Sequence, residues 1–284
     1  MKFQQQTVQC LSPSGLHRMA YTEWGDRHNP RVLVCVHGLT RNGRDFDALA
    51  EAMSGHYRVI CPDVVGRGQS ARLRDPAGYA VPQYVADMVT LIARLGVERV
   101  DWVGTSMGGL IGMALAAQEG TPVGRLVLND VGPVITVEAL HRIATYVGMD
   151  PTWNTFAEAL AYVKLVSAPF GPLTEAQWWT LTENSVGQRA DGRWGFLYDP
   201  QIAAPFKAAF ADQDIDLWPV YERITGPTLA IRGAASDLLP RATWQQMGER
   251  GPRAVLAEIA DVGHAPMFFD EAQISVVREF LLAA

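Results

Sequence analysis

The chain has 284 residues, of which 48% are hydrophobic and 19% charged, a composition typical of a globular protein with a sizeable buried core. Its formal net charge is -6 and its Lys and Arg residues are scattered, so we expect no nucleic-acid partner. No segment approaches the roughly 18 consecutive apolar residues of a membrane span, and the first residues lack an apolar signal stretch, so we expect no membrane association and a cytoplasmic location.

The chain opens with short apolar runs that alternate with a helical pattern. Segments 7–10 and 17–24 alternate apolar and polar residues and predict an antiparallel ribbon. The predicted buried strands are 32–36, 59–61, 100–103, 126–128 and 228–231. Residues 82–95 place apolar side chains on one face before Gly96 and predict a covering helix. This alternation favours a mainly parallel sheet with helices on both faces.

The apolar run 32–36 ends in His37-Gly38. A chain reversal at Gly38 would turn the N–H of Leu39 toward the carboxyl ends of the strands, where it can stabilise an oxyanion. His37 could itself be catalytic, but we favour a role in holding the loop by hydrogen bonding. Arg41 and Arg44 follow, and we favour solvated or paired roles for them over contact with an anionic substrate group.

The clearest chemical signal is Gly104-Thr-Ser106-Met107-Gly108, which follows the run 100–103 and precedes a helical segment with few bulky residues. This order is typical of a nucleophile elbow, where the serine is strained and small residues are needed two positions before and after it. The G-x-S-x-G pattern also occurs by chance in loops, but the strand before it and the helix after it favour the elbow. Ser106 is therefore the predicted nucleophile, and the N–H of Met107 the second oxyanion donor.

The rhythm changes between residues 133 and 225, where strand-like runs disappear. Five of the eight tryptophans lie there: Trp153, Trp178, Trp179, Trp194 and Trp218. We predict a helical cap insertion at 133–225 that covers the serine, and a core domain formed by 1–132 and 226–284. The aromatic residues either line an apolar substrate pocket or form the cap's own core, and we favour the second role for any single one.

Six short motifs follow one another over nearly the whole chain. They are His37-Gly38-Leu39, Asp63-Val-Val-Gly66-Arg-Gly68-Gln-Ser70, Gly104-Thr-Ser106-Met-Gly108, Leu128-Asn-Asp130-Val-Gly-Pro133, Gly233-Ala-Ala-Ser-Asp237 and Gly263-His264-Ala-Pro266. Together they resemble the α/β-hydrolase superfamily, in particular its serine-nucleophile esterase and lactonase-like members. The resemblance implies the α/β-hydrolase fold: a mostly parallel twisted sheet, helices on both faces and a helical cap insertion.

The resemblance also implies a catalytic triad in the order serine, acid, histidine. Ser106 is the nucleophile and His264, near the end of the chain, is the general base. Asp237, after the predicted strand 228–231, takes the position of the acid. Asp130 is the competing acid because some superfamily members place it after the preceding strand, and we favour Asp237 on its motif position.

The implied activity is hydrolysis of a carboxylic ester or lactone through an acyl-enzyme intermediate, with a small-molecule substrate and an oligomeric state left open. We expect no cofactor and no metal, because the sequence has no clustered His, Cys and carboxylate set with metal-ligand spacing. The alternatives are a carbon–carbon bond hydrolase or a perhydrolase on the same triad. A non-enzymatic ligand-binding member is disfavoured by the intact set of serine, histidine and acid.

Overall fold

The computed structural model describes residues 3–208 and 212–283. Its main sheet contains eight strands in the order β1-β2-β4-β3-β5-β6-β12-β13. The strands are β1 (Gln4–Ser12), β2 (Gly15–Trp24), β3 (Val32–Val36), β4 (Arg58–Pro62), β5 (Val100–Thr105), β6 (Val123–Asn129), β12 (Thr228–Gly233) and β13 (Val255–Ile259). β2 pairs antiparallel with β1 and β4, and all other neighbours are parallel. The predicted opening ribbon and mainly parallel sheet are therefore confirmed.

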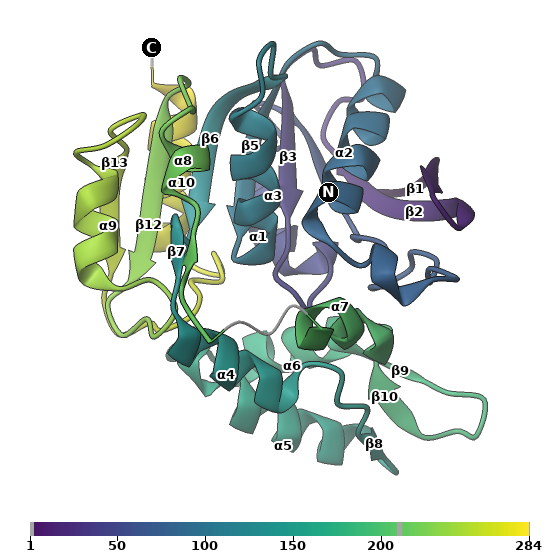
Figure 1. Ribbon diagram of the computed structural model, residues 1–284. Helices are drawn as coiled ribbons and strands as arrows, with labels where there is room; N and C mark the ends of the chain where they lie inside the picture. Colours follow the sequence, from purple (N-terminus) through teal and green to yellow (C-terminus); the bar gives the residue numbers. More distant parts are fainter. Residues whose placement is uncertain (1–2, 209–211, 284) are drawn as a thin grey trace.

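Helices cover both faces of this sheet (Figure 1). One face carries α1 (Asp47–Met53) and α10 (Glu271–Leu282), and the other carries α2 (Val81–Leu95), α3 (Met107–Ala116), α8 (Trp218–Tyr221) and α9 (Arg241–Met247). Strand β3 is apolar throughout because both of its faces are buried. Leu33 and Cys35 pack against the helices on one face of the sheet, and Val34 and Val36 pack against those on the other.

Helix α2 matches its predicted boundaries to within one residue. It begins at Val81 with a proline in its first turn, and its C-cap is Gly96 at φ 73°. Glycine adopts that left-handed conformation without the strain that a β-carbon would cause. None of the helices in the described part of the chain is both long and apolar enough to cross a membrane.

Most of the chain between β6 and β12 forms a second lobe, toward which the arrowheads of the parallel core strands point (Figure 1). Its helices are α4 (Val137–Tyr146), α5 (Phe156–Val166), α6 (Glu175–Ser185) and α7 (Ala203–Ala208). Its short strands are β8 (Thr152–Trp153), β9 (Val186–Gln188) and β10 (Trp194–Phe196), which form one small sheet. The strands β7 (Val134–Ile135) and β11 (Ile215–Asp216) pair with each other separately, where the chain leaves and re-enters the core. The sequence pattern missed these strands because two or three residues are too few to display an alternation.

The tryptophans between β6 and β12 have different surroundings. Trp153 and Trp178 are buried in the lobe's own apolar cluster, whereas Trp179 is 52% exposed. Trp218, on α8, packs instead into the core beside the sheet. Met267, from the core loop that carries His264, joins the cluster of the lobe and ties the two parts together.

Strand β13 was not predicted. It lies at the edge of the sheet beside β12, and its residues are exposed or only partly buried, with Val255 58% exposed. A strand covered so incompletely lacks the strong apolar signal of the buried strands, so its pairing with β12 decides its conformation.

Candidate active site

Ser106 lies at the sharp turn between β5 and α3, with φ 52° and ψ −116°. A β-carbon at Gly108 would lie 1.9 Å from the carbonyl oxygen of Val36, and one at Gly104 would lie 2.3 Å from the carbonyl oxygen of Gly108. Glycine is thus required on both sides of the strained serine. The strand, turn and helix predicted around Ser106 are all present.

His37 is fully buried and both of its ring nitrogens are engaged. Nδ1 lies 2.7 Å from the carbonyl oxygen of Gly38, and Nε2 lies 2.9 Å from the N–H of Val64. Because Val64 donates to Nε2, Nδ1 carries the proton and donates it to Gly38. Burial lowers the pKa of His37 to about 3, so the ring is neutral near pH 7. His37 holds the loop, as we favoured, and has no free nitrogen for proton transfer.

The hydrogen bond from His37 to the carbonyl oxygen of Gly38 also orients the N–H of Leu39. The Gly38 carbonyl oxygen accepts a second hydrogen bond from the N–H of Arg41. In a trans peptide the N–H of Leu39 points the opposite way from that carbonyl. A β-carbon built on Gly38 would lie 3.7 Å from the Cβ of Ser106, so this peptide group lies beside the serine. The geometry supports Leu39 as an oxyanion donor, together with Met107 in the first turn of α3.

The partner of His264 is Asp130. His264 Nδ1 lies 2.7 Å from Asp130 Oδ2, and the Asp130 side chain is completely buried. Asp130 also accepts hydrogen bonds from the N–H of Gly233 at 2.8 Å and the hydroxyl of Ser236 at 2.6 Å. These donors stabilise a buried carboxylate, which orients the imidazole and leaves Nε2 of His264 for the serine.

The prediction that Asp237 orients His264 is wrong in this structure. Asp237 is 51% exposed and forms an ion pair with Arg142 on α4 at 2.8 Å. The loop after β12 instead turns the neighbouring Ser236 inward, toward Asp130. Because β6 and β12 are adjacent parallel strands, both loops reach the same edge of the sheet, and motif position alone could not tell which acid points inward.

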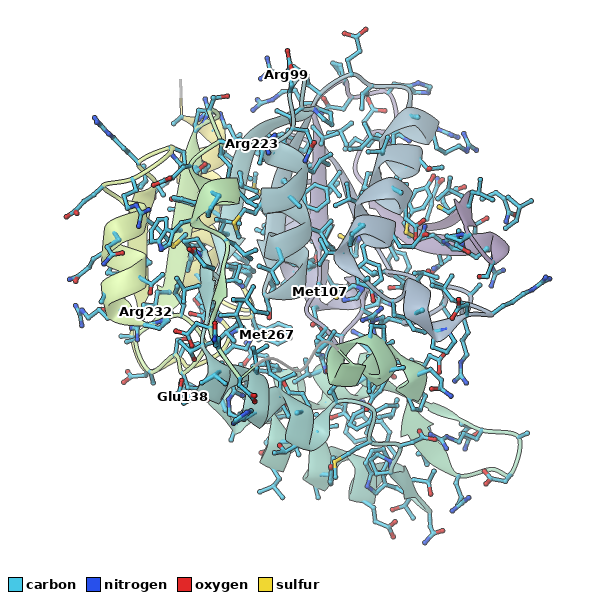
Figure 2. All side chains as sticks on the ribbon, viewed as in Figure 1. Arg99, Met107, Glu138, Arg223, Arg232 and Met267 are labelled. Atoms are coloured by element: carbon cyan, nitrogen blue, oxygen red, sulfur yellow. The ribbon has the colours of Figure 1, made fainter. Side chains whose placement is uncertain are left out.

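Asn129 links the serine turn to the histidine loop. Its side-chain amide donates to Thr105 Oγ1 and to the carbonyl oxygen of Pro266, both at 2.9 Å. Figure 2 shows Met107, which follows Ser106, and Met267, from the loop that carries His264, at the end of the core that faces the lobe. The hydrogen bonds of the described residues do not include one from Ser106 Oγ to His264. Proton transfer from Ser106 to His264 therefore stays a prediction. Hydrogen bonds between catalytic groups often tighten only when substrate is bound.

The loop His37-Gly38-Leu39 after β3 is called the oxyanion loop below, and the two arginines that follow it both have ion-pair partners. Arg41 Nε donates to Asp45 at 2.9 Å and its Nη1 to Ser185 on α6 at 2.8 Å. Arg44 pairs with Asp47 through Nε at 2.8 Å. Both therefore have structural partners, as we favoured, and Arg41 joins the core to the lobe.

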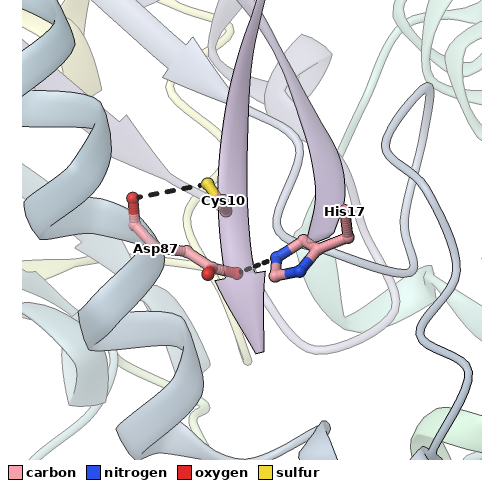
Figure 3. A group of neighbouring side chains, drawn as sticks. All are labelled: Cys10, His17 and Asp87. Carbon is pink, nitrogen blue, oxygen red and sulfur yellow. Dashed lines mark hydrogen bonds and ion pairs between the residues drawn. The ribbon is translucent and has the colours of Figure 1, made fainter. Parts of the chain in front are cut away.

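A cluster of possible metal ligands was missed by the sequence pattern. Cys10, His17 and Asp87 bring one ligand atom each to within 4.8 Å of one another, with all three residues buried (Figure 3). Cys10 and His17 are directly paired across β1 and β2, which is a contact between strands that residue spacing does not reveal. His17 Nε2 already bonds Asp87 Oδ2 at 2.9 Å. Burial, then the charge of Asp87, raises the pKa of the Cys10 thiol to about 12 and opposes the thiolate form that binds metals.

Residues 31–271 match the sequence family described as the α/β-hydrolase fold. The chain belongs to this family. The α/β-hydrolase is also 55% identical over 284 residues to a 3-hydroxybutyrate-oligomer hydrolase from Cupriavidus necator, with 98% of this chain and 97% of that protein covered.

Solved structures agree with the assignment. An α/β-hydrolase from Novosphingobium aromaticivorans is 36% identical and superimposes with a TM-score of 0.88, covering 98% of each chain. E-2-(acetamidomethylene)succinate hydrolase is 23% identical with a TM-score of 0.82, covering 99% of this chain and all of that one, and supports the fold alone. The predicted family and the predicted fold are thereby confirmed.

Proposed function

We propose that this α/β-hydrolase cleaves the ester bonds of short 3-hydroxybutyrate oligomers with Ser106 as the nucleophile. The substrate assignment rests on the full-length similarity to the hydrolase from Cupriavidus necator. Oligomers of a hydroxy acid are carboxylic esters, so this relative confirms the predicted class of carboxylic ester hydrolase. Lactone cleavage, carbon–carbon bond hydrolysis and peracid formation stay predictions of the sequence.

Acylation follows from the arrangement of the site. Nε2 of His264 takes the proton of the Ser106 hydroxyl as its oxygen attacks the ester carbonyl. Asp130 stabilises the positive imidazole through its 2.7 Å contact with Nδ1. The N–H groups of Leu39 and Met107 donate to the oxyanion. As the ester C–O bond breaks, the proton on His264 passes to the departing alkoxide oxygen, which leaves as a hydroxyl group.

Deacylation repeats the same proton transfers with water. His264 removes a proton from a water molecule, which attacks the acyl-serine carbonyl. Collapse of the second tetrahedral intermediate returns the proton to Ser106 and releases the 3-hydroxy acid. One water is consumed and one ester bond is broken in each cycle.

The test is to incubate the purified protein with the linear dimer and trimer of 3-hydroxybutyrate and to quantify released monomer by chromatography. Methyl butyrate is the matched simple ester, and the amide-linked dimer of 3-aminobutyrate is the matched control for the bond. We expect rapid cleavage of both oligomers, slower cleavage of methyl butyrate and none of the amide. The Ser106→Ala variant should be inactive on every ester.

Two outcomes would overturn different parts of this proposal. Cleavage of methyl butyrate without cleavage of the oligomers would remove the substrate assignment and leave the ester hydrolase. Full activity of Ser106→Ala would remove the nucleophile.

A further inference from the structure

Arg67 is one of the largest fully buried side chains of the protein, with 1% of its surface exposed. Its guanidinium contacts both residues that we assign to the oxyanion hole. Nε donates to the carbonyl oxygen of Leu39 at 2.8 Å, and Nη2 lies 3.6 Å from Sδ of Met107. Nη1 is held by the carbonyl oxygen of Val65 at 2.8 Å and the hydroxyl of Tyr84 at 2.9 Å.

All of these partners are neutral. Within residues 3–208 and 212–283, Arg67 forms no ion pair with a carboxylate. Its guanidinium lies over the aromatic rings of Tyr79 and Tyr84. A buried charge usually has a countercharge, because removing it from water is costly. Arg67 therefore has no direct ion-pair partner among the described residues, although the buried Asp199 accepts a hydrogen bond from the hydroxyl of Tyr79. Its positive charge lies beside Leu39 and Met107, where the mechanism generates a transient negative charge.

The contact with Leu39 completes the fixation of the oxyanion loop. His37 holds the peptide group before Leu39 through the Gly38 carbonyl, and Arg67 holds the peptide group after it through the Leu39 carbonyl. With both flanking peptide groups fixed, the Leu39 N–H keeps its direction without reorganising during the reaction.

We propose that Arg67 is a positioning residue of the oxyanion hole, which fixes the Leu39 carbonyl and places an unpaired positive charge beside the developing oxyanion. The inference rests on the proposed serine mechanism and deepens it. Arg67 does not touch the substrate and acts through Leu39 and Met107.

The lobe contributes to the position of Arg67. The N–H of Gly68 donates to the carbonyl oxygen of Leu197, and the N–H of Asp199 donates to that of Gly66, both at 2.7 Å. Arg67 itself forms an isolated antiparallel bridge with Tyr198. The backbone of the segment that carries Arg67 is thus paired with the lobe through the residues on either side of Arg67.

The test compares Arg67→Met, which loses the charge and the donors, with Arg67→Lys, which keeps the charge. The substrate is 4-nitrophenyl acetate, so the result does not depend on the oligomer assignment. We expect kcat of Arg67→Met to fall about 10- to 100-fold with KM nearly unchanged, because oxyanion interactions strengthen in the transition state. Arg67→Lys should recover part of the loss. A boronic acid that forms a tetrahedral serine adduct should bind Arg67→Met more weakly by a similar factor, whereas the acetate product should inhibit it as in the wild type.

Arg58→Met is the control for the loss of a largely buried arginine, with a side chain that is 11% exposed. Arg58 pairs with Glu23 and with the carbonyl oxygen of Leu95, so this variant should lose stability in thermal unfolding but keep kcat. Wild-type kcat in Arg67→Met would overturn the inference, and so would a kcat loss shared equally by Arg58→Met. If Arg67→Met does not fold, Arg67→Lys decides: a wild-type kcat and boronate affinity would overturn the inference, and a partial loss of both would support it. Activity in Ser106→Ala would instead overturn the proposed function.

Discussion

At the scale of single residues, the acid that serves His264 is defined by burial and by donors. Asp130 is fully buried and accepts three hydrogen bonds, while Asp237 is half-exposed and neutralised by Arg142. A carboxylate held in this way stabilises the histidine when it becomes positive, because it is not screened by water.

Replacing Asp130 by Asn should lower kcat on a simple ester by roughly 10⁴-fold, because the amide can no longer stabilise the required imidazole tautomer and its charge. Asp237→Asn is the matched variant and should keep kcat within about two-fold, since solvent screens its ion pair with Arg142. Steady-state kinetics of both variants, with circular dichroism to verify folding, provide the measurement. A silent Asp130→Asn together with a damaging Asp237→Asn would restore the original assignment.

At the scale of elements, the nucleophile elbow depends on close contact between α3 and β3. The space for a β-carbon at Gly108 is already occupied by the Val36 carbonyl oxygen. Gly108→Ala should therefore destabilise the protein by about 3 kcal/mol, because the helix must move away from the strand. Gly55→Ala is the control, since a β-carbon there meets nothing within 4 Å. Urea unfolding of the two variants measures the difference, and equal stabilities would show that the elbow tolerates a side chain.

The oxyanion loop should make stability depend on pH through His37. Burial lowers its pKa to about 3 in the folded protein, whereas an unfolded histidine titrates near 6.5. Between these pH values only the unfolded chain binds the proton, so lowering the pH removes about 1.4 kcal/mol of stability per pH unit. The contribution is fully present above about pH 6.5 and is lost as the pH falls.

His37→Gln removes this titration while its amide can still donate and accept. The stability gap between wild type and His37→Gln in urea unfolding should therefore shrink steadily from pH 7 to pH 5. The gap is the correct quantity, because burial also raises the pKa of Asp63 to about 6, which favours the folded state at acidic pH and affects both proteins equally. A gap that does not change with pH would contradict a buried neutral His37.

At the scale of the whole molecule, the lobe is joined to the core next to the loop after β3 and the loop that carries His264. Arg41 donates to Ser185, Asn42 donates to the carbonyl oxygen of Asn184, and Met267 enters the apolar cluster of the lobe. The lobe therefore contacts both of these loops, and its position affects the geometry of the site from two sides.

Met267→Ala should lower stability by about 2–5 kcal/mol, because it leaves a cavity where the core loop enters the lobe. Loosening of this contact should also expose the lobe to limited proteolysis. Leu165, on α5, is 74% exposed, so Leu165→Ala should change stability by less than about 0.5 kcal/mol. Proteolysis rates and urea unfolding together test the prediction, and a Met267→Ala variant as resistant as Leu165→Ala would show that the lobe is held elsewhere.

Local features of the site were predictable from the sequence because their parts are neighbours in the chain. The elbow needs Gly104, Ser106 and Gly108 within five positions, and the oxyanion loop needs His37 and Gly38 directly after a buried strand. The alternation of apolar runs and helices likewise predicted the parallel sheet, because each buried strand must be apolar on both faces.

Contacts between distant segments were decided only by the tertiary structure. Asp130 and Asp237 both follow strands that end at the same edge, and their spacing in sequence says nothing about which side chain turns inward. The guanidinium of Arg67 reaches Leu39 and Met107 from a different loop. Burial and hydrogen bonding between such segments arise only when the sheet assembles, so the acid and the support of the oxyanion hole depend on packing that no local pattern records.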